Sequence, residues 1–88
     1  MSPSVITVYM QARVEGRLLI FTLYGHPRDY PQHYVIRAWY TDARTPEPEP
    51  GPVWTYETLD DARLAIPEGL ALFTRGPGDD PTIVESYL

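Results

Sequence analysis

The chain has 88 residues, a net charge of -5, 43% hydrophobic and 12% aromatic residues, a composition typical of one globular domain over residues 1–88. Every positive side chain is an arginine and there is no cysteine. These features exclude disulfides and thiolate metal sites and argue against a nucleic-acid partner. There is no apolar run of about eighteen residues for a membrane span, and no signal-peptide pattern is visible in the first residues, so we expect a cytoplasmic protein.

The first element that the sequence predicts is a strand from Val5 to Val14, because apolar and polar residues alternate there. One side would carry Ile6, Val8, Met10, Ala12 and Val14, and the other Val5, Thr7, Tyr9, Gln11 and Arg13. A period of two is the pattern of a strand with one buried face. Glu15-Gly16 then indicates a tight turn that pairs this strand with the next as a hairpin.

The next two strands are predicted at Arg17–Tyr24 and His33–Thr41, separated by a loop that contains two prolines. The Arg17–Tyr24 strand is apolar on both faces, with Leu19, Phe21 and Leu23 opposed to Leu18, Ile20 and Tyr24. A strand of this kind is central in its sheet or covered twice. In the second of the two strands, Val35, Arg37 and Trp39 lie opposite Tyr34, Ile36, Ala38 and Tyr40.

Prolines occupy every second position between Thr45 and Pro52. Proline cannot donate a hydrogen bond to a sheet and favours the polyproline II conformation. Residues 45–52 therefore predict an extended, exposed and mobile connector rather than a strand. A short strand from Val53 to Tyr56 is expected to follow it.

One segment, Leu59–Ile66, predicts a helix. Thr58 is a suitable N-cap, and Asp60 and Asp61 place negative charge in the first turn, where the helix dipole favours it. Pro67 ends the helix, because the residue before a proline avoids the α conformation. Such a short helix is not stable alone, so we expect it to pack against the sheet.

Two more strands, Leu70–Arg75 and Thr82–Leu88, complete the predicted order βββ(β)αββ. This order predicts an α+β fold: a mostly antiparallel sheet of about four to six strands with one short helix packed on one face.

No catalytic, cofactor or metal site is predicted. His26, Asp29 and His33 could ligate a metal or supply a base, but their spacing matches no standard site, and no serine or cysteine lies in a nucleophile setting. Asp79 and Asp80 lie among glycine and proline, where aspartate commonly forms turns. The sequence therefore gives no support for an enzyme, and a ligand-binding or catalytic role for the His26–His33 loop is kept as an alternative.

A protein interface is predicted at Tyr9, Val35 and Trp39. On the expected strands these residues face away from the helix, and one short helix cannot cover both faces of a sheet. Exposed apolar area commonly marks an interface, where Tyr and Trp are enriched. We therefore expect the protein to act through protein contact as a homodimer. The alternative is that the C-terminal strands cover Trp39 within one chain.

The C-terminal segments Thr58–Arg63, Ile66–Leu70 and Asp79–Leu88 resemble small hypothetical proteins of GC-rich bacteria, and the complete absence of lysine and asparagine suits such a genome. Three strands followed by Thr58-Leu59-Asp60-Asp61-Ala62 are similar in topology to HicB-type antitoxins and to double-stranded-RNA-binding folds. The resemblance implies a bacterial or phage-borne protein. It adds one alternative function, an acidic inhibitor or antitoxin-like module that occupies a basic site on its target.

Overall fold

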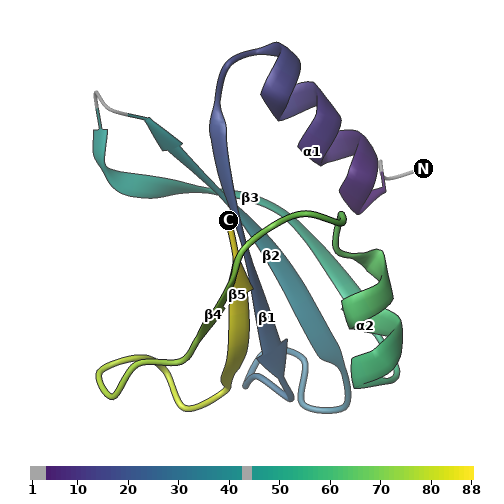
Figure 1. Ribbon diagram of the computed structural model, residues 1–88. Helices are drawn as coiled ribbons and strands as arrows, with labels where there is room; N and C mark the ends of the chain where they lie inside the picture. Colours follow the sequence, from purple (N-terminus) through teal and green to yellow (C-terminus); the bar gives the residue numbers. More distant parts are fainter. Residues whose placement is uncertain (1–3, 43–44) are drawn as a thin grey trace.

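The computed structural model describes residues 4–42 and 45–88. Its elements, in chain order, are α1 (Val5–Val14), β1 (Leu18–Gly25), β2 (Tyr34–Asp42), β3 (Thr45–Tyr56), α2 (Leu59–Ala65), β4 (Leu72–Thr74) and β5 (Ile83–Tyr87). The strands form one antiparallel sheet in the order β3-β2-β1-β5-β4 (Figure 1). The predicted α+β fold, an antiparallel sheet with a short helix packed on it, is confirmed.

The prediction of a strand at Val5–Val14 is wrong, because this segment is the helix α1. Ser4 is its N-cap, and the Ser4 hydroxyl oxygen accepts a hydrogen bond from the Thr7 amide at 3.3 Å. The buried residues Val5, Val8 and Ala12 follow the helical spacing i, i+3, i+7. The same residues therefore fit both the period-two pattern of a strand and the apolar stripe of a helix. β-branched residues favour a strand, but packing against the sheet selects the helix.

The end of α1 also differs from the predicted hairpin turn. Gly16 has a φ of 72°, in the left-handed region, directly after the C-cap Glu15. Its amide donates to the Arg13 carbonyl at 3.2 Å, and the Arg17 amide donates to the Ala12 carbonyl at 2.9 Å. This pair of bonds is a Schellman motif, which ends a helix and redirects the chain. Gly16 thus connects a helix to β1 rather than a strand to a strand.

Strand β1 is the central strand, as predicted from its apolar residues on both faces. Its residues Leu19, Phe21 and Leu23 are buried in a core with residues of α1, α2 and β2. Phe21 lies opposite Ala38, and Leu23 lies opposite Ile36. We call this side of the sheet the helical face, because both helices contribute to its core. The other side, with Tyr24, Val35, Arg37 and Trp39, is the open face.

The prediction of a connector at 45–52 is also wrong, because these residues form the first part of β3 and pair with β2. The predicted exposure holds at residues 47–50. Strand β3 lies at the edge of the sheet and has two irregularities in its register, and these are the places where a strand tolerates proline. Because successive N–H groups of a strand point to opposite sides, prolines at every second position can leave the side that bonds to β2 intact.

Gly51 is required by the close approach of β3 to β2. A Cβ atom at this position would lie 2.8 Å from a ring carbon of Tyr40 and 3.1 Å from the Ala38 carbonyl oxygen. A Cβ atom here would force the Tyr40 ring or the neighbouring backbone to move, so the glycine suits the close pairing of the two strands.

The predicted helix at Leu59–Ile66 is confirmed as α2, which ends one residue earlier, at Ala65. Thr58 is its N-cap, and the Thr58 hydroxyl accepts from the Asp61 amide at 3.1 Å. The two C-terminal strands are present with shorter bounds than predicted. In the described part of the chain, neither helix is long and apolar enough to cross a lipid bilayer.

Val8 and Val14 distinguish the helix from the predicted strand, because a strand would place both on the same buried face. In the structure Val8 is 7% exposed and Val14 is 87% exposed. We expect Val8→Ala to lower the free energy of unfolding by about 2 kcal/mol, and Val14→Ala to change it by less than about 0.5 kcal/mol. Chemical denaturation of both variants measures this, and equal losses would contradict the helix.

Candidate functional site

A hollow with a volume of about 860 Å³ lies on the open face. Tyr24 of β1 and Arg37 and Trp39 of β2 contribute sheet residues to it. Two loops form its walls, 27–29 between β1 and β2 and 78–82 between β4 and β5. Its position beside the sheet makes it the candidate small-ligand site of this fold.

The charged groups of this hollow bind mainly to one another and to their own loops. Arg37 forms an ion pair with Asp29. The Asp80 carboxylate accepts from the Thr82 amide at 2.8 Å and from the Thr82 hydroxyl at 2.7 Å. Asp79 accepts from the Gly76 amide at 2.8 Å. The two aspartates therefore close their loop, as the turn composition predicted.

Hydrogen bonds from the Thr82 amide, and then from its hydroxyl, lower the pKa of Asp80 below its usual value, and the nearby Arg28 adds to this. Asp80 is therefore ionised at neutral pH and is unsuited to act as a general acid there.

The Tyr24 ring lies on the open face, with the Arg37 guanidinium carbon 5.8 Å from its centroid. Burial raises the pKa of Tyr24 above its ordinary value, while the charge of Arg37 and a hydrogen bond with Trp39 lower it in part. A phenol with a raised pKa stays protonated at neutral pH, so it can bind a ligand by hydrogen bonding but is a poor base.

The structure does not bring His26, Asp29 and His33 together as a site. His26 Nδ1 bonds to the Pro31 carbonyl oxygen at 3.0 Å, and its amide donates to the His33 carbonyl at 3.0 Å. Asp29 instead binds Arg37. Across residues 4–42 and 45–88, no group of three or more His, Cys, Asp or Glu side chains could hold a metal ion. The two histidines hold the loop, whereas Asp29 reaches the hollow.

The three predicted interface residues lie on two sides of the sheet. Tyr9 is on α1, and its ring centroid is 6.4 Å from that of Phe21 on the helical face. Val35 is fully buried and Trp39 is half-buried, both on the open face. The sequence placed Tyr9 with the other two because it treated α1 as a strand. Whether these residues form an interface stays a prediction.

The loop before β5, rather than a strand folded over the sheet, lies beside Trp39. Pro81 and Thr82 of this loop line the same hollow as Trp39. The open face is therefore partly covered within one chain by its own loops.

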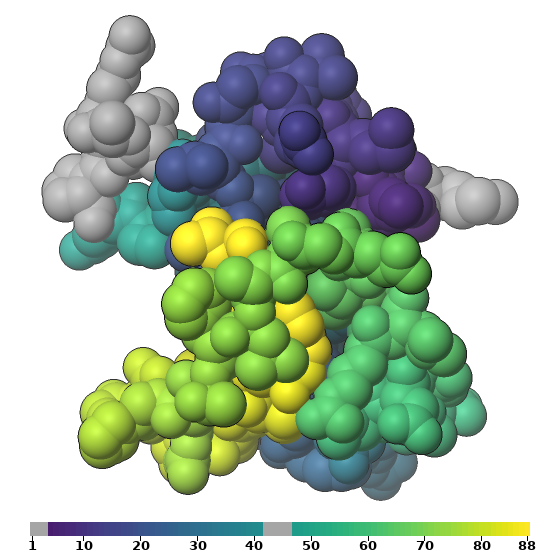
Figure 2. Space-filling model, viewed as in Figure 1, coloured from purple at the N-terminus to yellow at the C-terminus, as the bar shows by residue number. Residues whose placement is uncertain are grey.

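A second surface, which the sequence did not predict, lies on the outer side of the helices. Ile6, Tyr9 and Met10 of α1 and Leu64 of α2 line a hollow of about 650 Å³ with the segment that follows α2. A smaller hollow of about 240 Å³ adjoins it at Tyr9 and is lined by Leu18, Leu70 and Leu88, among others. Figure 2 views the molecule from this side. We define the contact face as the five exposed apolar side chains around Tyr9, namely Ile6, Met10, Leu64, Leu18 and Leu88.

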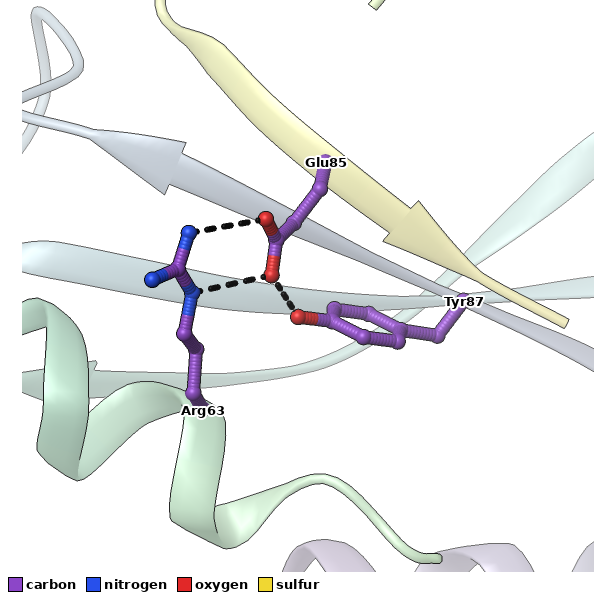
Figure 3. A network of polar contacts seen from close by, with 3 residues as sticks. All are labelled: Arg63, Glu85 and Tyr87. Carbon is purple, nitrogen blue, oxygen red and sulfur yellow. Dashed lines mark hydrogen bonds and ion pairs between the residues drawn. The ribbon is translucent and has the colours of Figure 1, made fainter. Parts of the chain in front are cut away.

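A polar network connects α2 to β5 (Figure 3). The Glu85 carboxylate accepts two hydrogen bonds from the Arg63 guanidinium, at 3.1 and 3.0 Å, and one from the Tyr87 hydroxyl. The Glu85 side chain is 8% exposed and that of Arg63 is 47% exposed. None of the three residues is among those that line the three hollows described above, and the network links α2 to β5.

Comparisons of the chain with protein-family models, with curated proteins and with solved structures found no match. The resemblance to small proteins of GC-rich bacteria and to HicB-type antitoxins therefore stays a prediction, and the proposals below rest on the geometry of the chain itself.

The raised pKa of Tyr24 predicts a loss of stability in alkali. The unfolded chain ionises its tyrosines near pH 10, whereas folding holds the Tyr24 proton more tightly, so this contribution is present below about pH 10 and is lost as the pH rises through the folded pKa. Burial also raises the pKa of Tyr56. An absorbance titration of tyrosinate, compared with the chain in denaturant, should show a late-ionising fraction that Tyr24→Phe reduces. An unchanged late fraction would contradict the burial of Tyr24.

Proposed function

We propose that this protein acts through contact with protein surfaces and that its partner is a second copy of the same chain. The observation that carries this proposal is the exposure of the contact face. Ile6, Met10 and Leu64 are 52%, 61% and 83% exposed although each is a large apolar side chain. Contiguous exposed apolar residues in a soluble domain commonly mark an interface.

Helix α1 is apolar on two sides. Val5, Val8 and Ala12 face the core, while Ile6, Met10 and Val14 form an outer row at the spacing i, i+4, i+8. The fold of one chain leaves this outer row exposed, and an exposed apolar row commonly marks a contact with another chain. A row at this spacing is a ridge that packs into the groove of an identical helix, so two copies can meet across a twofold axis.

The distribution of charge supports self-contact. The chain has a net charge of -5, yet Arg13 is the only charged residue among the ten residues of α1. The cores of protein interfaces are depleted of charged residues. Repulsion between two acidic chains is also weakest where their surfaces carry the least charge.

The alternative functions have weaker support. A ligand-binding role is supported by the hollow on the open face, but Arg37 and Asp29 at its wall already pair with each other. The acidic-inhibitor role rests on net charge, and a bacterial, cytoplasmic setting rests on composition.

Met10→Glu tests the contact face. We expect self-association to weaken by at least about tenfold in its dissociation constant, because the new carboxylate would lose its water in an apolar contact. Sedimentation equilibrium over a range of concentrations measures the change. Thr55→Glu, at an exposed position on the open face, is the control and should leave self-association unchanged.

The reverse result, with Thr55→Glu dissociating the protein and Met10→Glu not, would move the interface to the open face beside Trp39. A wild type that sediments as a monomer at all accessible concentrations would overturn the proposal. Circular dichroism of each variant confirms that it is folded.

A further inference from the structure

The two edges of the sheet are protected to very different degrees. At one edge, β3 has prolines at positions 48, 50 and 52, which cannot donate hydrogen bonds to a further strand. At the other edge, β4 spans Leu72–Thr74 and contains no proline and no charged residue. Proteins usually protect an edge strand with prolines, charges or bulges. Strand β4 has no proline, no charge and no bulge, and its short length is its only protection of this kind.

The hydrogen bonds between β4 and β5 determine which backbone groups of β4 are free. Ala71 and Leu88 exchange two hydrogen bonds, at 3.0 and 3.1 Å, in the register that continues into β4 and β5. Backbone groups alternate along a strand, so Phe73 also faces β5, whereas Leu72 and Thr74 direct their N–H and C=O groups outward. Within residues 4–42 and 45–88, no loop or cap makes a backbone hydrogen bond to these outward groups.

The side chains of this edge are exposed apolar groups on both sides of the sheet. Leu72 is 53% exposed and lies on the helical face opposite Tyr87. Phe73 is 52% exposed and lies on the open face opposite Ser86. An incoming strand would thus find free backbone groups between two apolar side chains, which is the arrangement that strand addition requires.

We propose that β4 pairs in antiparallel orientation with β4 of a second copy and joins the two sheets. An axis through Phe73 places this residue opposite its counterpart, and places Leu72 opposite Thr74 of the other chain. The outward groups of Leu72 and Thr74 then satisfy one another across the axis. The two phenylalanines form a close aromatic pair, which stabilises neighbouring strands.

Charge is compatible with this register. Arg75, the first charged residue after β4, falls opposite Ala71 of the other chain, so the pairing brings no two like charges together. The segment from Leu70 to Thr74 is uncharged. The edge therefore suits a copy of itself.

This pairing is a second contact, independent of the contact face proposed above. Each contact uses the same patch on both chains and so has its own twofold axis. Two such contacts on one chain join dimers into a closed tetramer or a longer assembly.

Two substitutions separate the contacts. Leu72→Pro removes an outward N–H group and leaves the hydrogen bonds between β4 and β5 intact, as the prolines of β3 do at their own edge. Met10→Glu disrupts the contact face. We expect sedimentation equilibrium to find four or more chains for the wild type, two for each single variant and one for the double variant.

A mass for Leu72→Pro equal to that of the wild type would overturn the β4 pairing without affecting the contact face. A monomeric Met10→Glu single variant would also overturn it, because no second contact would then remain. An unchanged Met10→Glu with a dissociated Leu72→Pro would overturn the contact face alone. If Leu72→Pro fails to fold by circular dichroism, Phe73→Lys replaces it, because this exposed side chain can carry a charge without loss of a backbone bond.

Discussion

The position of α2 on the sheet depends on the buried carboxylate of Glu85. It lies on the helical face of β5 and needs a partner there, because a buried charge without one is strongly destabilising. Arg63 provides that partner from α2, and Tyr87 provides a further hydrogen bond. A helix of seven residues is not stable alone. The ion pair of Arg63 and Glu85, which we call the clamp, acts together with the packing of α2 on β2 and β3 around the buried Ala62 to hold α2 in place.

The position of α2 determines what the remaining surfaces can do. With α1 and α2 on the same side of the sheet, the helical face is filled and the apolar outer side of α1 adjoins Leu64. The two loops border the open face beside Tyr24 and Trp39, where Asp29 of one loop forms an ion pair with Arg37 of β2. Apolar contact surface is therefore concentrated on the outer side of the helices and at the edge formed by β4.

The sequence predicts those elements whose signals are local. The Thr58 cap and Pro67 delimit α2, and runs rich in apolar and aromatic residues identify β1 and β2. The sequence-based prediction fails at α1, because β-branched residues at that spacing fit both a strand and a helix. Packing against the sheet decides between the two. The prediction fails at β3 because proline is excluded from a central strand but tolerated in an edge strand. The edge position of β3 depends on the tertiary structure, which the local sequence does not reveal.

The candidate surfaces were predictable only in part, for the same reason. Tyr9 does adjoin the contact face, but as a helical neighbour of Ile6 and Met10 and not as a strand residue beside Trp39. Val35 is buried, which alternation alone does not reveal. The inward position of Glu85 depends on Arg63, 22 residues away in the sequence.

A double-mutant cycle on Arg63 and Glu85 tests the clamp most directly. Denaturant unfolding would compare Arg63→Met, Glu85→Met and the double variant with the wild type. Arg63→Met leaves the buried Glu85 without its ion pair, which should lower the free energy of unfolding by about 1–3 kcal/mol. We expect a loss near the lower end of this range, because water reaches the half-exposed Arg63. The account predicts that the double variant loses clearly less stability than the two single losses added together. Additive losses would show that the two residues stabilise the fold independently and would contradict the clamp.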